Sequence, residues 1–267
     1  MLKLSVLIPT YNEDCSRLVN DLQAQLPTDA EIIVGDDGPP HNLGRAARRN
    51  ALAEEARGEW LLFIDADAEV RSRSFIANYM AACNQAPVVC GGTGNLPACP
   101  RPEARLRYDY EVKAEKRRTL QYRQAHPYDG FTTFNFLIRR DLFLSIRFDE
   151  SLKHYGHEDT QFGLELKKRG VPVLHIDNKL THLGIEDAAD YLRKVETGLR
   201  TLASMSVEQK HNVRISTLAL RLEHLHLLGP VRFVYSMSKS LLRKNLLGHR
   251  PSQVLFAFYK LGYYISL

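Results

Sequence analysis

Short apolar runs alternate with amphipathic stretches over the first two thirds of the chain. Residues 3–8, 31–34, 60–64 and 88–92 are apolar runs of strand length. Residues 15–26, 45–57 and 74–84 instead repeat apolar positions at helical spacing. The run at 60–64 has no polar interruption, which is typical of a strand covered on both faces. This alternation predicts an α/β fold, a mostly parallel sheet flanked by helices.

Local signals set the expected ends of several elements. Asn12-Glu13-Asp14 offers a cap and an acidic first turn to the first helix. Gly58 is expected to end the helix at 45–57, and Gly170 the helix at 160–169. Further strands are expected at 134–138 and 173–176, and a further helix at 188–205. Residues 99–130 are polar and tyrosine-rich, and their pattern assigns no element.

The last part of the chain has a different character. Residues 211–267 contain eight lysines and arginines but one acidic residue, Glu223, whereas the whole chain carries a net charge of +5. The pattern predicts two or three amphipathic helices, broken near residues 229–230 and 248–251. We therefore predict an α/β domain over residues 1–210 and a basic helical extension over residues 211–267.

Bulk composition narrows the classes of protein. The 267 residues are 44% hydrophobic and 25% charged, as in an ordinary globular protein. Because the positive charge gathers in the tail, we expect no broad nucleic-acid surface. The four cysteines lack C-x-x-C spacing and are expected to be free thiols. We see no secretory signal or membrane span, which favours a cytoplasmic protein.

Acidic residues follow two of the expected parallel strands. Asp65-Ala66-Asp67 comes directly after the buried run, and alternation puts its two carboxylates on one side of an extended chain. Such a pair attracts a hard cation such as Mg²⁺ or Mn²⁺, which can then bridge to phosphate oxygens. A solvated surface turn is the alternative. Asp36-Asp37-Gly38 also ends a strand, where it could accept from a ring N–H or form an ordinary Asp-Gly turn.

Two later positions also carry candidate chemistry. Glu158-Asp159 opens a helix, where acids either complement the helix dipole or supply a general base. His182 follows the strand at 173–176 and is either structural or a ligand. It becomes relevant to chemistry if the fold brings it beside Asp67.

Five short motifs, in order, resemble the inverting family 2 glycosyltransferases of the GT-A fold. They are residues 5–12, residues 34–38, Arg49-Asn50 with residues 58–67, residues 134–140 with 147–150, and residues 155–159. The resemblance covers about residues 3–185. It departs from the family at Pro39-Pro40, at Ala68 and at Arg147, which stands where a glycine is common before Phe-Asp-Glu.

The resemblance implies roles by position. Asp67 and His182 would bind a divalent metal, Mn²⁺ or Mg²⁺, and Asp65 would bind ribose or reach the metal through water. Asp159 would be the catalytic base, supported by Glu158. The nucleoside pocket would be lined by Pro9, Thr10, Tyr11 and Asp37.

The implied function is metal-dependent, inverting transfer of a sugar from a nucleotide-diphospho-sugar, first of all a UDP-sugar, to a hydroxyl of a glycan or lipid-linked acceptor. The alternatives are a sugar nucleotidyltransferase and a non-catalytic nucleotide-sugar-binding module. A nucleotidyltransferase would want a glycine-rich basic loop after the first strand, which Pro9-Thr10-Tyr11-Asn12 does not offer.

Two surfaces are candidates for an acceptor or a membrane. Residues 101–123 carry eight basic and four acidic residues with Tyr108, Tyr110 and Tyr122, and they form either an acceptor wall or a solvated helix. The tail places Val254, Phe258, Leu261 and Ile265 on one helical face. That face suits an anionic membrane surface, with the protein peripheral on its cytoplasmic side, about as well as packing onto the catalytic domain.

Overall fold

The computed structural model describes residues 2–38, 43–151, 156–211 and 213–267. The chain forms two compact units. Unit 1 comprises Met1–Leu96, Ala114–Lys153 and Glu158–Gly184, and unit 2 comprises Pro97–Lys113, His154–His157 and Ile185–Leu267. The predicted boundary at residue 211 falls inside unit 2, which begins its last segment 26 residues earlier, at Ile185.

Unit 1 is built on a sheet with the strand order β2-β1-β3-β7-β5-β8. Its strands are β1 (Leu4–Thr10), β2 (Ala30–Asp36), β3 (Trp60–Ile64), β5 (Val88–Cys90), β7 (Asn135–Arg139) and β8 (Val173–His175). All neighbours pair in parallel except β7, which runs antiparallel to both β3 and β5. The predicted mostly parallel sheet is confirmed.

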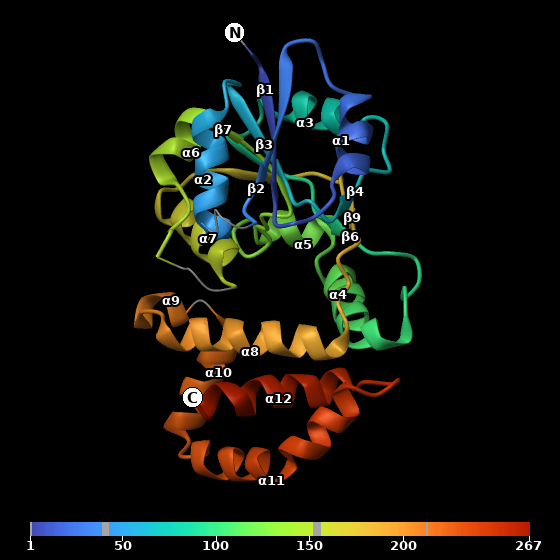
Figure 1. The fold of residues 1–267 in the computed structure, drawn as a ribbon. Helices are drawn as coiled ribbons and strands as arrows, with labels where there is room; N and C mark the ends of the chain where they lie inside the picture. Colours follow the sequence, from blue (N-terminus) through green and yellow to red (C-terminus); the bar gives the residue numbers. More distant parts are fainter. Residues whose placement is uncertain (1, 39–42, 152–155, 212) are drawn as a thin grey trace. The chain divides into compact units, whose positions relative to one another are not determined.

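Helices cover both faces of this sheet (Figure 1). On one face lie α1 (Ser16–Gln23) and α3 (Phe75–Ala82), and on the other α2 (Arg45–Glu55), α6 (Arg140–Ile146) and α7 (Glu158–Lys168). Strand β3 contributes to the apolar core on each face of the sheet. Leu62 packs in the core beneath α1 and α3, and Leu61 and Phe63 pack in the core beneath α2, α6 and α7. All five β3 residues are buried, which explains why its sequence is apolar at every position.

A second, small sheet brings together segments that are distant in the sequence. It has the order β4-β9-β6, formed by β4 (Ala68–Glu69), β9 (Leu180–His182) and β6 (Thr93–Gly94). In the antiparallel β4–β9 pair, Ala68 lies opposite His182. The turn after β3 is thereby fixed next to residues more than 110 positions later in the chain.

The two glycines that were expected to end helices have different roles. Gly170 has φ +64° and ends α7, as predicted. Helix α2 instead ends at Ala56 in an extended conformation, so the prediction for Gly58 was wrong. A Cβ at Gly58 would lie 2.5 Å from the backbone of Leu4 and Ser5. Gly58 is therefore required by the close approach of the chain to β1.

The segment from residue 99 to residue 130, which the pattern left unassigned, is largely helical. It contains the 3₁₀ turn η1 (Pro102–Ala104), α4 (Arg105–Arg117) and α5 (Leu120–Ala125). Within unit 2, Tyr110 of α4 packs edge-on against Phe256, with ring centroids 5.6 Å apart, and Lys260 lies over its ring. Arg107 pairs with Glu111 and Glu186. These two members of the expected acceptor wall therefore contribute to packing within unit 2.

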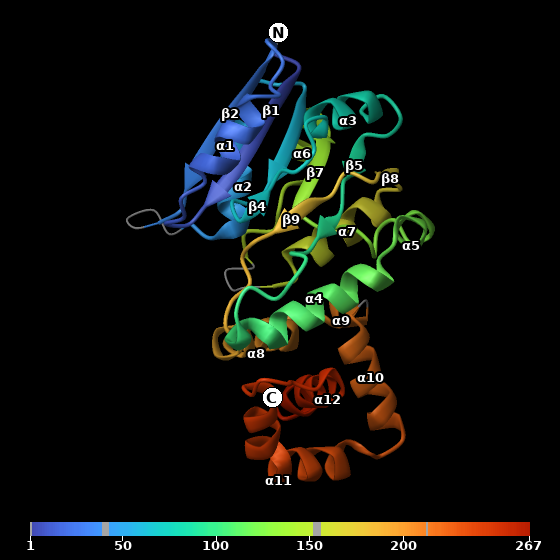
Figure 2. The same ribbon diagram turned by 90° about the vertical axis from the view of Figure 1, so that its right-hand side faces the viewer.

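Unit 2 has its own apolar core. Its further helices are α8 (Ala188–Ser204), α9 (Val207–His211), α10 (Arg214–His224), α11 (Leu228–Leu246) and α12 (Gln253–Ile265) (Figure 2). Helix α12 packs against α8, α10 and α11. Gly229 and Pro230 lie in the first turn of α11 and do not break a helix, because a proline is tolerated there.

Two features of the tail bear on how it meets other surfaces. Of the apolar face predicted on α12, Ile265 is buried and Phe258 packs against the core of unit 2, whereas Val254, at the start of the helix, is exposed. Within the described part of the chain, no helix combines the length and the apolar character needed to cross a bilayer.

The cysteines at positions 15, 83, 90 and 99 are free thiols, as expected.

Arg147 has a strained backbone. It follows α6 with φ 57° and ψ 159°, a region that glycine adopts and residues with a Cβ avoid. Its guanidinium pairs at 2.7 Å with Glu54, and both side chains are about half exposed, so the pair adds little stability. The glycine common at this position in the family resemblance has a conformational reason.

We predict that Arg147→Gly raises the free energy of unfolding by about 1 kcal/mol, because it removes the strain at a smaller cost in unfolded-chain entropy. Arg147→Ala is the matched control, since it removes the same ion pair but keeps the Cβ. Urea unfolding of the two variants measures the difference. Equal stability of the glycine and alanine variants would show that the backbone at this position stores no strain.

Candidate active site

The carboxyl ends of three parallel strands meet at one edge of the sheet. Thr10 at the end of β1 lies opposite Asp36 at the end of β2, and β3 runs alongside β1 and leads into Asp65. In open α/β sheets, ligands bind beyond the carboxyl ends of the strands. This edge is therefore where unit 1 is expected to hold a ligand.

The two acids that follow β2 face different partners. Asp36 accepts hydrogen bonds from the Asn12 amide (2.8 Å) and the Thr10 hydroxyl (3.1 Å), and the Asn12 bond in particular lowers the pKa of Asp36. Asp37 is buried, and its two oxygens accept from the amides of Leu43 (2.6 Å) and Gly44 (2.7 Å). Sequence reasoning selected Asp37, whereas Asp36 is the acid joined to the Thr10–Asn12 turn.

The other residues expected around a nucleoside lie on or just after β1. Pro9 is half-buried in the strand, Thr10 is buried, and Tyr11 leaves 60% of its surface exposed. An exposed aromatic ring at the carboxyl edge of a sheet can stack on a planar ligand. Pro39 and Pro40, the sequence departures that follow Gly38, lie outside the described residues.

Arg49 connects the two acidic clusters of the site. Its guanidinium, on α2, is 3% exposed and donates to Asp65 at 2.6 Å. Burial disfavours the charge of Arg49, but Asp65, Glu158 and Asp159 together outweigh that cost and raise the pKa of Arg49. The acids after β3 and the acids that open α7 therefore act on one buried cation.

A second arginine on the same helix strengthens this connection. Arg45 lies one turn before Arg49, and its guanidinium comes within 3.8 Å of the Glu158 carboxylate. Asp65 keeps 26% of its side chain exposed, yet burial raises the pKa of Asp65, with Arg49 opposing that rise and Asp67 adding to it. Sequence reasoning quoted Arg49 in a motif but gave it no role. The sequence feature that could have indicated its role is its spacing from Arg45, since two arginines four residues apart lie on the same side of a helix.

Asp67 and His182 lie side by side, because β4 pairs with β9. The His182 Nε2 and Asp67 Oδ2 atoms are 3.0 Å apart, and the imidazole is buried edge-on against Phe134. The Leu183 amide donates to the Asp67 carbonyl at 2.8 Å. The condition that sequence reasoning set for His182 is met, since the fold places it beside Asp67.

Gly184 keeps the space next to this pair open. A Cβ at this position would lie 2.1 Å from Asp67 Oδ2 and 3.1 Å from His182 Nε2. A carboxylate and an imidazole beside a space that any side chain would fill are suitable ligands for a divalent cation. Within the described residues, no cluster of three or more histidines, cysteines or acids is arranged to hold a metal. Phosphate and water would supply the other ligands.

Glu158 and Asp159 occupy the first turn of α7. Asp159 Oδ1 accepts from the amide and the hydroxyl of its neighbour Thr160, at 2.7 Å and 3.3 Å. Asn50 fixes the chain before this helix. Its side-chain amide donates to the Phe148 carbonyl and to the Glu150 carboxylate, and its side-chain oxygen accepts from the Phe148 backbone amide. Tyr155, part of the motif at 155–159, lies outside the described residues.

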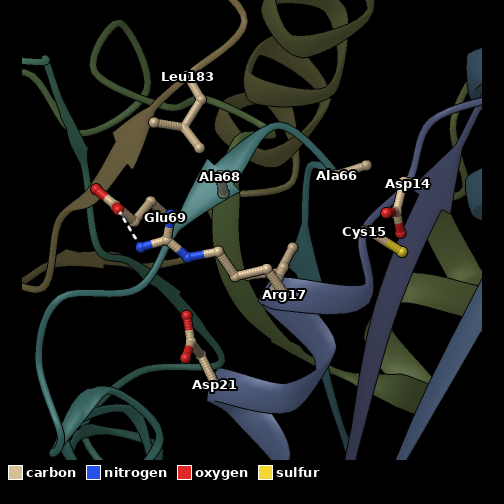
Figure 3. Close-up of a pocket in the computed structure, with 9 residues that line it drawn as sticks. Asp14, Cys15, Arg17, Asp21, Ala66, Ala68, Glu69 and Leu183 are labelled. Carbon is tan, nitrogen blue, oxygen red and sulfur yellow. Dashed lines mark hydrogen bonds and ion pairs between the residues drawn. The ribbon is translucent and has the colours of Figure 1, made fainter.

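A shallow pocket adjoins the turn that carries Asp65 and Asp67 (Figure 3). The start of α1 lines one side of it, and Ala66, Ala68 and Leu183 line the other. In Figure 3, Arg17 reaches across to Glu69. The Arg17 and Glu69 atoms that bond are 2.8 Å apart, and Arg71, which the figure does not draw, donates to the same carboxylate. These contacts attach α1 to the strand that follows the acidic turn.

A mostly parallel sheet, a pair of acids after its central strand and a small sheet that brings a histidine to those acids define a GT-A transferase fold. Residues 39–147 match the model of the family described as glycosyl transferase family 2. This part is less than half of the chain, and it includes β3 and the acidic turn. The chain is therefore a glycosyltransferase with a GT-A fold, and its residues 39–147 are similar to family 2.

One solved structure with a TM-score above 0.5 gives the same fold class, and two others are similar to the chain at lower scores. A mannosyltransferase from Pyrobaculum calidifontis, in complex with GDP-Man and Mn²⁺, is 14% identical over 99% of this chain and 85% of its own, with a TM-score of 0.58. TarS from S. aureus is 18% identical over 79% of this chain, with a TM-score of 0.48, and this chain spans 41% of its length. TarS 1–349 in complex with UDP-GlcNAc is 16% identical over 99% of this chain and 90% of its own, with a TM-score of 0.49. No curated protein matches the chain.

We predict that Arg49→Met lowers the free energy of unfolding by about 2 kcal/mol, because it leaves Asp65 beside other acids without a cation. The figure is below that for a fully buried pair because Asp65 is partly exposed. Adding Asp65→Asn to Arg49→Met should restore part of the loss. Urea unfolding of the four proteins in this cycle measures the coupling, and strictly additive losses would contradict the account.

Proposed function

We propose that the protein transfers a sugar from a nucleotide-diphospho-sugar to a hydroxyl of a glycan or lipid-linked acceptor, with inversion at the anomeric carbon. The observation that carries the proposal is that α2 pairs with acids of both elements. Arg49 bonds Asp65 after β3 at 2.6 Å, and Arg45, one turn earlier, comes within 3.8 Å of Glu158 on α7. One site could therefore present acids from both elements to a donor and an acceptor. A UDP-sugar is the first donor to test.

In this proposal the donor's nucleoside lies over the ends of β1 and β2. Tyr11, exposed, would stack on the base, and Pro9 and Thr10 would line the pocket. Asp37 would reach the base edge, as the family resemblance implies. It would then have to exchange one of its bonds to the amides of Leu43 and Gly44. Asp36 is the other acid at this strand end.

The diphosphate would lie beside the turn at Asp65–Asp67. Asp67 and His182 would hold Mn²⁺ or Mg²⁺, with Asp65 contacting the ribose or the metal-bound water. When bound, such a cation supplies positive charge that stabilises the developing charge on a diphosphate leaving group. The P. calidifontis mannosyltransferase, solved with GDP-Man and Mn²⁺, supports the choice of metal.

Asp159 would act as the general base. A sugar hydroxyl is a poor nucleophile near neutral pH, so transfer needs a group that removes its proton as it attacks. Asp159 would take that proton while the new glycosidic bond forms and the bond to the diphosphate breaks. A single displacement of this kind inverts the anomeric carbon and needs no covalent intermediate, unlike the retaining route of glycosidases. Glu158, paired with Arg45, would hold the start of α7 in place.

The geometry favours this proposal over the two alternatives. A binding module leaves no reason for one helix to pair with acids of both β3 and α7, yet Arg49 bonds Asp65 and Arg45 lies near Glu158. It also leaves no reason for Asp67 to lie 3.0 Å from His182. A sugar nucleotidyltransferase would want a glycine-rich basic loop after β1. Thr10, Tyr11 and Asn12 occupy that position, with Asn12 bonded to Asp36.

We predict that Asp159→Asn lowers the rate of transfer by about 10²–10⁴-fold while the donor still binds, because only the proton acceptor is lost. Asp141→Asn is the matched control. Asp141 also sits in the first turn of a helix and bonds the amide of the next residue, but it pairs with Arg139 at the surface. Release of nucleoside diphosphate measures turnover, and calorimetry measures binding. Wild-type turnover by Asp159→Asn would remove Asp159 from the base role.

We further predict that Asp67→Ala abolishes the increase in donor affinity that Mn²⁺ produces in the wild type. The substitution removes one of the two side chains, Asp67 and His182, that would hold the metal ion. Asp21→Ala removes the same charge from the nearby pocket and should leave the Mn²⁺ effect intact. Calorimetry with a UDP-sugar, with and without Mn²⁺, measures both variants. An unchanged Mn²⁺ effect in Asp67→Ala would contradict the metal site.

A further inference from the structure

Helix α11 carries apolar side chains on two opposite sides. Tyr235, Leu242 and Leu246 point inward and are buried in the core of unit 2, where α11 packs against α12. Phe233, Met237 and Leu241 recur every four residues on the other side, so they form one stripe along the helix. We call these three residues, with Val234 beside them, the α11 stripe.

The α11 stripe is exposed. Phe233, Met237 and Leu241 leave 68%, 72% and 71% of their surfaces accessible, and Val234 leaves 52%. A helix on the surface of a soluble protein normally turns polar residues outward. Leucines just outside the two ends of the helix, at positions 225, 227 and 247, are exposed as well. A row of exposed apolar side chains along one side of a helix marks an interaction surface.

The charge around the α11 stripe has one sign. Residues 224–267 contain no aspartate or glutamate and six lysines and arginines. Lys239 and Lys244 on α11 are exposed, as is Arg250 just after it. Lys244 follows Leu241 by three residues and so lies on the same side of the helix. A partner that covers this surface must accept apolar side chains and supply negative charge.

We propose that α11 lies flat on an anionic lipid bilayer and inserts the α11 stripe among the acyl chains. This is the pattern of an interfacial helix, with apolar groups on one side and cations that meet acidic headgroups. The helix is about 28 Å long, from 19 residues at 1.5 Å each, which is close to the thickness of a bilayer core. Its four basic residues do not suit a spanning helix, so we propose that it lies along the bilayer surface. A second copy of the chain fits less well, because α11 against α11 would bring Lys244 and its neighbours together without an acid.

The test is sedimentation of the full chain with vesicles, with no donor or acceptor present. We expect binding to vesicles of phosphatidylcholine with phosphatidylglycerol and little binding to phosphatidylcholine alone. The triple variant Phe233→Ser, Met237→Ser, Leu241→Ser should weaken binding about tenfold or more. Val207→Ser, Leu218→Ser, Val254→Ser is the matched control, which removes three exposed apolar side chains elsewhere and should bind as the wild type does.

A charge variant keeps the proposal testable if the serine variant is poorly folded. Lys244→Glu leaves the apolar stripe intact and reverses the charge beside it, and it should weaken the preference for phosphatidylglycerol. Thermal unfolding checks that each variant is folded. Equal binding of the wild type to both kinds of vesicle, or undiminished binding by a folded serine variant, would overturn the proposal. So would a wild-type dimer in light scattering that the serine substitutions dissociate without any vesicle binding. None of these outcomes depends on the transferase activity.

Discussion

The buried guanidinium of Arg49 is the interaction on which the site depends. Asp65 and Asp67 lie two residues apart at the carboxyl edge of the sheet, and neighbouring carboxylates repel one another. Glu158 on α7 pairs with Arg45, one turn before Arg49. Arg49 is nearly inaccessible to solvent and bonds Asp65 directly. Its raised pKa shows that the surrounding acids more than offset the cost of burying it.

The rest of unit 1 positions the groups around that cation. Strand β3 is buried on both faces, so its packing fixes the position of the turn that carries Asp65 and Asp67 directly after the strand. Pairing of β4 with β9 brings His182 to Asp67, and Gly184 leaves the space beside them open. On the other side, Asn50 holds the chain ahead of α7 through the backbone of Phe148. Helix α2 carries both Arg49 and Asn50, so one helix aligns the two halves of the site.

The sequence predicted what depends on local pattern and missed what depends on distant contacts. Residues 60–64 were predicted with the bounds observed for β3, because a strand buried on both faces is apolar throughout. Helix α4 was considered only as the solvated-helix alternative for residues 101–123, and its bounds were not predicted, because its surface is dominated by charges that pair one turn apart, such as Arg105 with Asp109. Arg49 received no role because it lies among Arg45 and Arg48, a run that resembles a solvated face. In the tail, periodicity found amphipathic helices but placed the free apolar face on α12. In the structure, Ile265 of that face is buried and Phe258 is partly buried, although Val254 is exposed, whereas α11 exposes a whole row of apolar side chains.

The most direct test of the central claim is a crystal structure of the protein with UDP and Mn²⁺. The account predicts anomalous scattering from manganese at Asp67 and His182, the diphosphate beside the Asp65–Asp67 turn, and the side chain of Asp159 facing the same cavity. A nucleotide bound elsewhere in the molecule, or manganese bound without contact to Asp67, would contradict it.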